Sequence, residues 1–424
     1  MRLIYTLSVH MYLALSRVIA LFSSKARLWS SGRKGLLNHM ASVVKHEASS
    51  DNTNPVIWFH CASLGEFEQG RPVLEAFRKE FPTWRILLTF FSPSGFEVRK
   101  DYAHADHVFY LPLDTPGRVN RFLDLWKPAM VVFVKYEFWF NYMDALFKRQ
   151  IPLYVISAIF RPSQHFFKWY GQWARKHLHF VSRIFVQDAQ SAELLAAHGL
   201  RNVEHSGDTR FDRVYKLGQS PADYPLVKQF TQGHRVIVAG STWPEDEALL
   251  QAIPLHDVHK IRFIIAPHEV HEERIRQLLK QWQGKALRYS EFDGNASTEV
   301  RALIIDRIGM LSSLYQYGDM ALIGGGFGKG IHNTLEAATF GLPVLIGPNY
   351  KKFAEARELL ARGGACCVQS PGDFRKRVKA FLDDPEALRE AAGTGRHYVA
   401  TQRGATDMIM DELRTKANAY VPSF

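Results

Sequence analysis

A glycine-rich stretch at residues 324–353 carries the residue types that bind a phosphate-bearing ligand. It reads GGGFGKGIHNTLEAATFGLPVLIGPNYKKF and follows the apolar residues 320–323. This order predicts a strand, a glycine loop, a helix from about Asn333 and a second strand at 343–346, which together make one parallel crossover unit. Glycines let a ligand approach the backbone, and the free N–H groups at a helix N-terminus favour an anion such as phosphate.

The spacing within this stretch argues against two common nucleotide sites. Its glycines do not fit GxGxxG, and Lys329 is not followed by Ser or Thr as in a Walker motif, so an ordinary dinucleotide or ATP site is disfavoured. Asn333 and Glu336 have the spacing of a capping box, in which both side chains satisfy N–H groups at the helix start. A carboxylate at Glu336 could also accept two ribose hydroxyls, and the two interpretations are compatible.

A second candidate site follows the apolar run at 56–60, where the sequence reads CASLGEFE. We expect Glu66 to begin a helix at the carboxyl end of a strand, which is a common ligand position in open α/β sheets. A carboxylate there could act as a general base on a sugar hydroxyl. The alternative is an acid that only complements the helix dipole, and Glu68 is a rival for either role.

Two charged motifs follow later strands. Lys135 and Glu137 lie between an apolar run and aromatic residues, so they are either site residues or an internal ion pair that closes the strand end. Arg210, in the sequence GDTRFD, could clamp a phosphate or carboxylate bidentately. Alternatively, it pairs with Asp208 or Asp212 as a structural clasp, and the sequence favours this alternative.

A further pair of candidates, Pro267 and His268, closes the apolar run at 261–266. Residues there could contact a base or a phosphate, although a lone histidine is more often structural than catalytic.

The elements that position these residues alternate between short apolar runs and helical patterns. Strands are expected at 56–60, 85–91, 107–111, 129–134, 152–158, 183–186, 236–240, 261–266, 302–305, 320–323 and 343–346. Such alternation predicts doubly wound parallel sheets. The pattern breaks at 214–234, which holds Gly218, Pro221, Pro225 and Gly233. We therefore expect two α/β domains that face each other across a cleft.

Composition fits this division. The chain has 424 residues, of which 46% are apolar and 22% charged, so a folded protein of two domains is the natural expectation. The net charge of +11 suits nucleic acid, an anionic membrane or a phosphorylated substrate. The three cysteines, Cys61, Cys366 and Cys367, show neither a disulfide framework nor the spacing of a zinc site.

The N-terminal residues 1–22 are apolar and aromatic, interrupted by Arg2, His10 and Arg17, and basic residues follow at Lys25, Arg27, Arg33 and Lys34. An apolar run beside a basic cluster predicts a membrane anchor on the cytoplasmic side. The alternative is a buried N-terminal helix. The run is borderline in length for a spanning helix.

Several of these motifs together resemble the 3-deoxy-D-manno-octulosonic acid (Kdo) transferases. The likeness rests on SLGEFEQGRP (63–72), KYEFW (135–139), GDTRFD (207–212), APHE (266–269) and the glycine stretch at 324–353, and it covers nearly the whole chain. Many members of the family have an acidic residue in place of Lys135 and an arginine in place of His268.

The resemblance implies a GT-B fold of two Rossmann-like domains, CMP-Kdo as the donor, and a lipid A precursor of the lipid IVA type as the acceptor. It implies no metal or other cofactor. Glu66 matches the catalytic base, and Arg210, Lys135 and Glu137 fall at further catalytic motifs. The residues that match the CMP site are Pro267, His268, Ile308, Gly309, Met310, Asn333, Thr334, Leu335 and Glu336.

The resulting expectation is an enzyme at the cytoplasmic face of the cell inner membrane, in contact with its anionic surface and not with nucleic acid. We expect an anchor with its basic flank at 1–35, an acceptor domain at 36–213, a linker at 214–234, and a CMP-sugar domain with C-terminal helices at 235–424. The alternatives are a GT-B transferase that uses a UDP-sugar, or a basic membrane-surface protein without catalysis.

Overall fold

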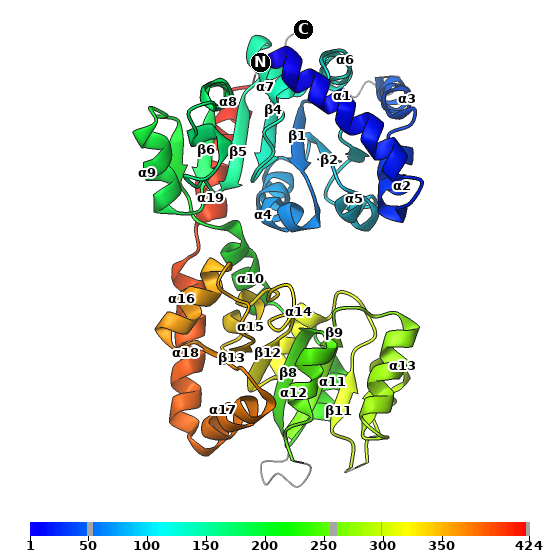
Figure 1. Ribbon diagram of the computed structural model, residues 1–424, viewed down its shortest axis with the longest axis vertical. Helices are drawn as coiled ribbons and strands as arrows, with labels where there is room; N and C mark the ends of the chain where they lie inside the picture. Colours follow the sequence, from blue (N-terminus) through cyan, green and yellow to red (C-terminus); the bar gives the residue numbers. More distant parts are fainter. Residues whose placement is uncertain (49–53, 255–260, 298, 421–424) are drawn as a thin grey trace. The chain divides into compact units, whose positions relative to one another are not determined.

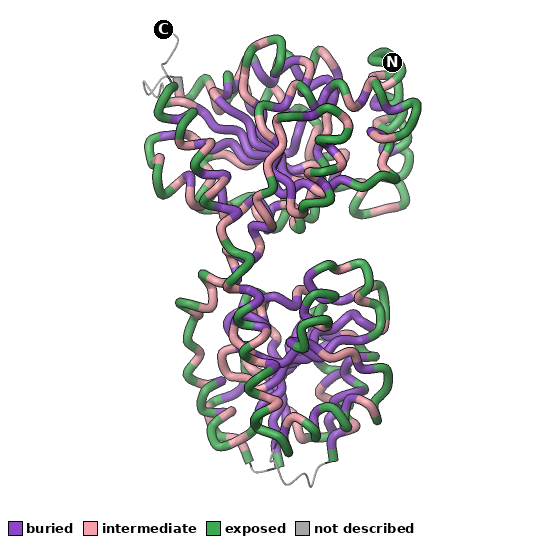
Figure 2. Tube along the Cα trace, turned by 90° about the vertical axis from the view of Figure 1, so that its left-hand side faces the viewer, coloured by how far each residue is buried: buried purple, intermediate pink, exposed green. Residues whose placement is uncertain are grey.

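The strands of this chain gather into two parallel sheets, each flanked by helices (Figure 1). The computed structural model describes residues 1–48, 54–254, 261–297 and 299–420, and within them each sheet has seven strands. The inner strands of both sheets are buried along nearly all of their length (Figure 2), as parallel sheets covered on both faces require.

The first sheet has the strand order β3-β2-β1-β4-β5-β6-β7. Its strands are β1 (Val56–Cys61), β2 (Arg85–Phe90), β3 (His107–Tyr110), β4 (Met130–Val134), β5 (Leu153–Ala158), β6 (Arg183–Val186) and β7 (Val203–His205). The helices of this half are α1 (Arg2–Ile19), α2 (Ser24–Ser31), α3 (Leu36–Ala48), α4 (Leu64–Glu80), α5 (Pro93–Arg99), α6 (Pro116–Trp126), α7 (Phe140–Lys148), α8 (Gln172–Leu178) and α9 (Ala189–Ala197).

The second sheet has the order β10-β11-β9-β8-β12-β13-β14. Its strands are β8 (Arg235–Thr242), β9 (Ile261–Pro267), β10 (Ala286–Arg288), β11 (Ala302–Ile304), β12 (Met320–Ile323), β13 (Val344–Ile346) and β14 (Ala365–Cys367). The remaining helices are α10 (Thr209–Gln219), α11 (Pro225–Thr231), α12 (Pro244–Leu250), α13 (Glu272–Gln281), α14 (Leu311–Leu314), α15 (Leu335–Thr339), α16 (Ala354–Arg362), α17 (Pro371–Asp383), α18 (Pro385–Thr401) and α19 (Ala405–Asn418).

The division of the chain differs from the expected one at its C-terminal end. One unit comprises Met1–Asp212 with Arg403–Phe424, and the other comprises Arg213–Gln402. The last helix, α19, therefore belongs to the first unit, because Ile409, Met410 and Leu413 are buried in the core that also holds residues of β1 and α4. The stretch expected as a linker at 214–234 contains most of α10 and all of α11.

Helix α1 belongs to the first unit and is held there by polar contacts. The Tyr5 hydroxyl donates to Asp114 Oδ2 at 2.6 Å, and Arg2 forms an ion pair with Asp144 at 3.3 Å. Asp114 also accepts from the backbone N–H groups of Asn141 and Tyr142. No helix within the described residues is both long and apolar enough to cross a membrane.

Replacing Tyr5 with phenylalanine is expected to lower the free energy of unfolding by roughly 1.5–3 kcal/mol, because a buried carboxylate loses a donor. Burial raises the pKa of Asp114 to about 6 from an ordinary value of 3.8, and the Tyr5 hydroxyl opposes that rise. The folded state therefore loses stability as the pH rises from about 4 to about 6, where Asp114 becomes charged. The loss caused by Tyr5→Phe should be larger at pH 7 than at pH 4, and urea unfolding at both pH values measures it. An equal loss at both pH values would contradict this account.

Candidate functional site

The candidate site residues of the first unit follow strands β1 and β4, between which the strand order of the sheet reverses. Strand β1 pairs with β2 on one side and with β4 on the other. Ligands of open α/β sheets bind at the carboxyl ends of the two strands at such a switch point. Glu66 follows β1, while Lys135 and Glu137 follow β4. Sheet order therefore brings two motifs far apart in sequence to one edge.

A buried network joins these two strand ends. Glu137 Oε2 accepts from His60 Nε2 at 2.9 Å and from Trp139 Nε1 at 2.7 Å. His60 is fully buried, and its Nδ1 lies 2.9 Å from Thr89 Oγ1 on β2. Glu137 is thus held by His60 and Trp139 and ties β4 to β1. The sequence analysis missed His60, although a histidine inside an apolar strand is a signal that it needs a polar partner.

Glu66 lies in the first turn of α4, where the Ser63 hydroxyl donates to its carboxylate. Ser63 is the N-cap residue, but its side chain makes no cap hydrogen bond. Glu66 is half-buried, and this hydrogen bond orients its carboxylate. Glu68 has different partners, since it pairs with Arg99 at 2.9 Å and with Arg71 at 3.8 Å. Of the two carboxylates, Glu66 therefore has the surroundings of a site residue and Glu68 those of a structural one.

Strained backbone marks the same edge of the sheet. Lys135 has φ of 69° directly after β4, and Ser157 has φ of 54° in β5. Left-handed backbone at residues other than glycine costs roughly 1–3 kcal/mol and is concentrated at functional sites. The Nζ of Lys135 lies 5.5 Å from the centroid of the Tyr136 ring.

Arg210 forms the clasp that the sequence favoured. Its Nε and Nη2 lie 2.8 Å and 2.7 Å from Asp208 Oδ2, and its backbone N–H donates to Asp208 Oδ1. The adjacent Thr209 hydroxyl donates to the backbone carbonyl of Gln69 on α4, so this segment is tied to the helix that carries Glu66.

The other acid of this segment holds the C-terminal helix. Asp212 accepts from the backbone N–H groups of Gly404 and Thr406 and from the Thr406 hydroxyl, each at 2.7 Å.

The second unit has a switch point between β8 and β12, and it too is bridged by a buried carboxylate. Asp246 Oδ2 accepts from the Gly325 N–H at 2.8 Å and from the Trp243 N–H at 2.9 Å. Trp243 follows β8 and Gly325 follows β12, so Asp246 joins the two strand ends. Burial raises the pKa of Asp246. The sequence analysis missed Asp246, because its hydrogen bond to the glycine loop joins residues 79 positions apart.

The glycines of this loop are needed for packing within the protein. A Cβ at Gly324 would lie 2.2 Å from the Ser241 carbonyl oxygen, and one at Gly326 would lie 2.5 Å from the Gly347 nitrogen. Gly325 has φ of 88°, which glycine adopts most easily. The interpretation that close approach of a ligand explains these glycines is therefore wrong for Gly324 and Gly326, whose space is occupied by neighbouring backbone.

A stack of three rings lies at the end of β8 and β9. His268 packs between Trp243 and His332, with ring centroids 4.8 Å and 4.5 Å away and interplanar angles of 28° and 24°. His268 is exposed, whereas His332 is half-buried. Burial, helped by the nearby His268, lowers the pKa of His332 to about 4. His332 is therefore neutral at physiological pH, and His268, although exposed, has a ring packed against each of its faces.

The helix after the glycine loop is shorter than expected. α15 has five residues, and its N-cap residue is Thr334, not Asn333. Asn333 Oδ1 accepts from the Leu335 N–H at 3.0 Å, and Asn333 Nδ2 donates to Glu336 Oε1 at 3.1 Å. The capping-box interpretation is wrong in detail, because Asn333 precedes the cap and binds Glu336 through its side chain.

The remaining donor-site candidates lie in the loop after β11. Ile308 is 87% exposed, Gly309 has φ of 91°, and Met310 is buried. In the described part of the chain, no three His, Cys, Asp or Glu side chains are grouped so that they could hold a metal ion.

The sequence of this chain is similar to those of one known family of enzymes. A family model described as 3-deoxy-D-manno-octulosonic-acid transferase (kdotransferase) matches residues 34–213. A 3-deoxy-D-manno-octulosonic acid transferase of Haemophilus influenzae is 28% identical over 84% of this chain and 86% of its own length. A 3-deoxy-D-manno-octulosonic acid transferase of Aquifex aeolicus is 29% identical over 75% of this chain and 83% of its own length.

The fold also has solved counterparts. A UDP-GlcNAc 2-epimerase of Neisseria meningitidis matches with a TM-score of 0.58, covering 85% of this chain and all of its own, at 16% identity. At that identity the likeness concerns the fold alone. Two Rossmann-like units with parallel sheets of seven strands make this a GT-B fold.

Proposed function

Since this chain belongs to the 3-deoxy-D-manno-octulosonic acid (Kdo) transferase family, we propose that this glycosyltransferase moves Kdo from CMP-Kdo to a lipid A precursor in lipopolysaccharide biosynthesis. One observation carries the proposal: Glu66 and the glycine stretch each follow a strand at the switch point of its own sheet. These are the positions at which open α/β sheets bind ligands.

In this reaction Glu66 is the general base. It removes the proton of an acceptor hydroxyl while that oxygen forms a bond to the anomeric carbon of Kdo. The bond from the anomeric carbon to the phosphate oxygen of CMP breaks, and CMP leaves with the electron pair. The Ser63 hydroxyl supports this role, because it orients the carboxylate of Glu66.

Stabilisation of the leaving CMP is assigned to Arg210 and the donor site. The contact between Arg210 and Asp208 leaves the side chain oriented at the start of α10, where a guanidinium can attract the phosphate. Pro267, His268, residues 308–310 and residues 333–336 are assigned to CMP. The exposed edge of the His268 ring supports a hydrogen bond to CMP, and Glu336, oriented by Asn333, supports a contact to the ribose.

Replacing Glu336 with glutamine is expected to weaken CMP binding about tenfold or more, since a charged acceptor for ribose hydroxyls becomes neutral. The Asn333 amide can still donate to the remaining side-chain oxygen, so the melting temperature should change little. Isothermal calorimetry with CMP and thermal unfolding separate the two effects. A large loss of stability with unchanged CMP affinity would assign Glu336 to the fold alone.

The proposed reaction is tested by mass analysis of the product formed from CMP-Kdo and a tetraacylated lipid A precursor. The expected product is the acceptor heavier by one or more Kdo residues. Protection from heat by CMP, and not by UDP, is the expected result for the free enzyme. Protection by UDP alone together with no Kdo product would favour a transferase that uses a UDP-sugar.

A membrane surface is the proposed location, on the cytoplasmic face of the inner membrane. Support comes from α1, whose Tyr5, Val9 and Ser16 face the protein while a row of large apolar side chains faces outward. That row consists of Leu3, Ile4, Leu7, Met11, Leu15 and Val18, each more than half exposed. An amphipathic helix of this kind lies in the membrane interface.

The double substitution Leu7→Ser with Leu15→Ser is expected to reduce binding to inner-membrane vesicles by about tenfold per leucine, because burying each one contributes roughly 1.5–3 kcal/mol. The melting temperature should not change, since both side chains are already exposed. Val98→Ser is the control, because Val98 is 56% exposed and belongs to α5, not to α1. Equal vesicle binding by the natural protein, the Leu7→Ser, Leu15→Ser variant and the Val98→Ser variant would contradict the proposed location.

A further inference from the structure

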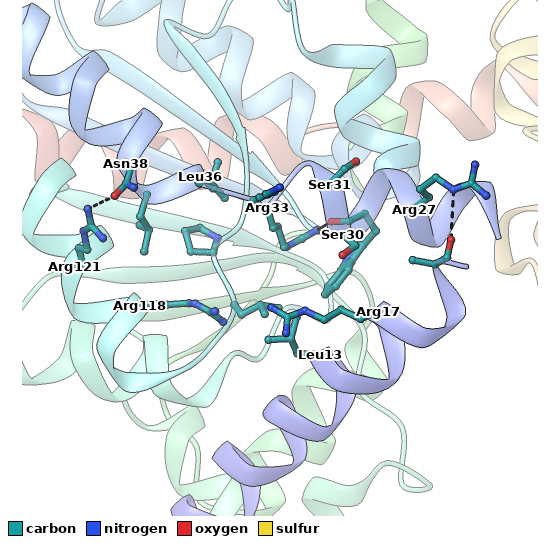
Figure 3. Close-up of a pocket in the computed structure, with 17 residues that line it drawn as sticks. Leu13, Arg17, Arg27, Ser30, Ser31, Arg33, Leu36, Asn38, Arg118 and Arg121 are labelled. Carbon is teal, nitrogen blue, oxygen red and sulfur yellow. Dashed lines mark hydrogen bonds between the residues drawn. The ribbon is translucent and has the colours of Figure 1, made fainter. Parts of the chain in front are cut away.

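A basic pocket of about 550 Å³ lies in the first unit, apart from the strand ends that carry the candidate site. It is bounded by α1, α2, the start of α3 and α6 (Figure 3). Its basic lining residues are Arg17, Arg27, Arg33, Lys34, Arg118 and Arg121. None of the described residues that line it is an aspartate or a glutamate.

The charges in this pocket are only partly compensated. The side chains of Arg17 and Arg118 point toward one another above Leu13 (Figure 3). Among the described residues neither has a carboxylate within ion-pair distance, and the same holds for Lys34. Like charges that face each other repel, so an anion bound between them would be stabilised by both.

The other three arginines that Figure 3 labels at the pocket wall already have partners, and the Nε of Arg27 donates to the Ala20 carbonyl oxygen at 3.4 Å. Arg33 donates to the carbonyl oxygens of Phe91 and Leu111, and its guanidinium lies 4.2 Å from the centroid of the Trp29 ring. Arg121 donates to the Asn38 side chain at 2.7 Å. Arg17, Lys34 and Arg118 are therefore the basic lining residues whose side chains make no hydrogen bond or ion pair within the described part of the chain, and they are the groups able to bind an anion.

The position of Arg118 strengthens this reading. It lies in the first turn of α6, a helix of 11 residues without an acidic residue in that turn. The N-terminus of a helix carries a partial positive charge, so a cation there is unfavourable unless an anion accompanies it.

An apolar pocket lies on the other side of the C-terminal half of α1. It has a volume of about 360 Å³ and shares Trp29 with the basic pocket. Its apolar lining includes Tyr12, Leu15, Ile19, Phe91 and Pro93. One helix thus separates a basic pocket from an apolar one.

We propose that these two pockets bind one phosphorylated membrane lipid, with its phosphate between Arg17 and Arg118 and an acyl chain along the apolar pocket. A guanidinium pair suits the phosphate, because each can donate two parallel hydrogen bonds to its oxygens. The apolar pocket favours a lipid over a free phosphate or a nucleotide, since neither of these has an apolar chain to bury. The site goes beyond the proposed transferase reaction and needs no residue assigned to it.

The test measures cosedimentation of the full-length protein with phosphatidylcholine vesicles that contain phosphatidic acid. The variant Arg17→Gln with Arg118→Gln should bind these vesicles at least roughly 30-fold more weakly than the natural protein, because two charge-assisted contacts are lost. The matched control is Lys79→Gln with Lys148→Gln, which removes the same charge from exposed positions outside the pocket. Its binding should stay within about fivefold of the natural protein.

Three results would overturn the proposal. Equal losses in both double variants would mean that only overall charge matters. Displacement of the protein from vesicles by inorganic phosphate at the concentration of lipid phosphate would mean a site for the free ion. A lower melting temperature of Arg118→Gln without lipid would give Arg118 a structural role, whereas an unchanged or higher one is expected from relief of repulsion. Because vesicle binding is measured without CMP-Kdo, its outcome is independent of whether the transferase reaction is correct.

Discussion

Glu66→Gln is expected to lower turnover at least about 100-fold, because proton transfer by a positioned group contributes roughly 10²–10⁴-fold to the rate. Glutamine keeps the shape of the side chain and can still accept a hydrogen bond from Ser63, but it cannot take a proton. CMP affinity should be unchanged, since CMP is assigned to the other unit. Turnover with CMP-Kdo under saturating acceptor measures the effect.

Glu68→Gln is the control for this prediction, and the structure says what it should do. Glu68 pairs with Arg99 and Arg71, so its loss should reduce stability while turnover stays within a few-fold. Turnover that survives in Glu66→Gln and disappears in Glu68→Gln would mean that the base is misassigned. If both variants stay active, the carboxylate at the start of α4 serves the helix dipole only.

Glu137→Ala is expected to lower the free energy of unfolding by about 3–5 kcal/mol, because it removes the carboxylate that accepts from both His60 and Trp139 in the buried network. Glu137→Gln retains an oxygen at that position and should cost less than about 1.5 kcal/mol. Urea unfolding measures both values. Glu193→Ala, which removes an exposed glutamate from α9, should change the stability by less than about 0.5 kcal/mol.

The two Glu137 variants also separate a structural role from a catalytic one. If Glu137 acts in the reaction, Glu137→Gln should be folded and nearly inactive. If it only holds β1 and β4 together, Glu137→Gln should be folded and active. A loss below about 1 kcal/mol in Glu137→Ala would show that the network contributes little to the fold, contrary to its burial.

Much of the fold could be predicted from local pattern. Short apolar runs separated by helical segments identified most of the strands, and their bounds agree with the structure within one or two residues at β1, β2, β6, β9 and β12. Three short strands, β7, β10 and β14, were not assigned residue ranges, since three residues carry too little periodicity. The glycine stretch was located correctly between β12 and β13, although two of its glycines serve backbone packing.

Local pattern failed where a residue's partner lies far along the chain. His60 and Glu137 are separated by 77 positions, and Asp212 and Thr406 by 194. The placement of α19 with the first unit depends on the latter contact and on burial beside α4, neither of which has a signature within its own segment.

By itself the sequence determined the α/β class, the positions of the main strands and helices, and the motifs that carry the candidate chemistry. These depend on interactions among residues a few positions apart, which backbone geometry fixes directly. Only the tertiary structure decided that Glu137 binds His60, that Asp246 binds the glycine loop, and that Arg17 and Arg118 share a pocket. Those contacts depend on which strands and helices are neighbours, and that order minimises the free energy of the whole domain, not of any one segment.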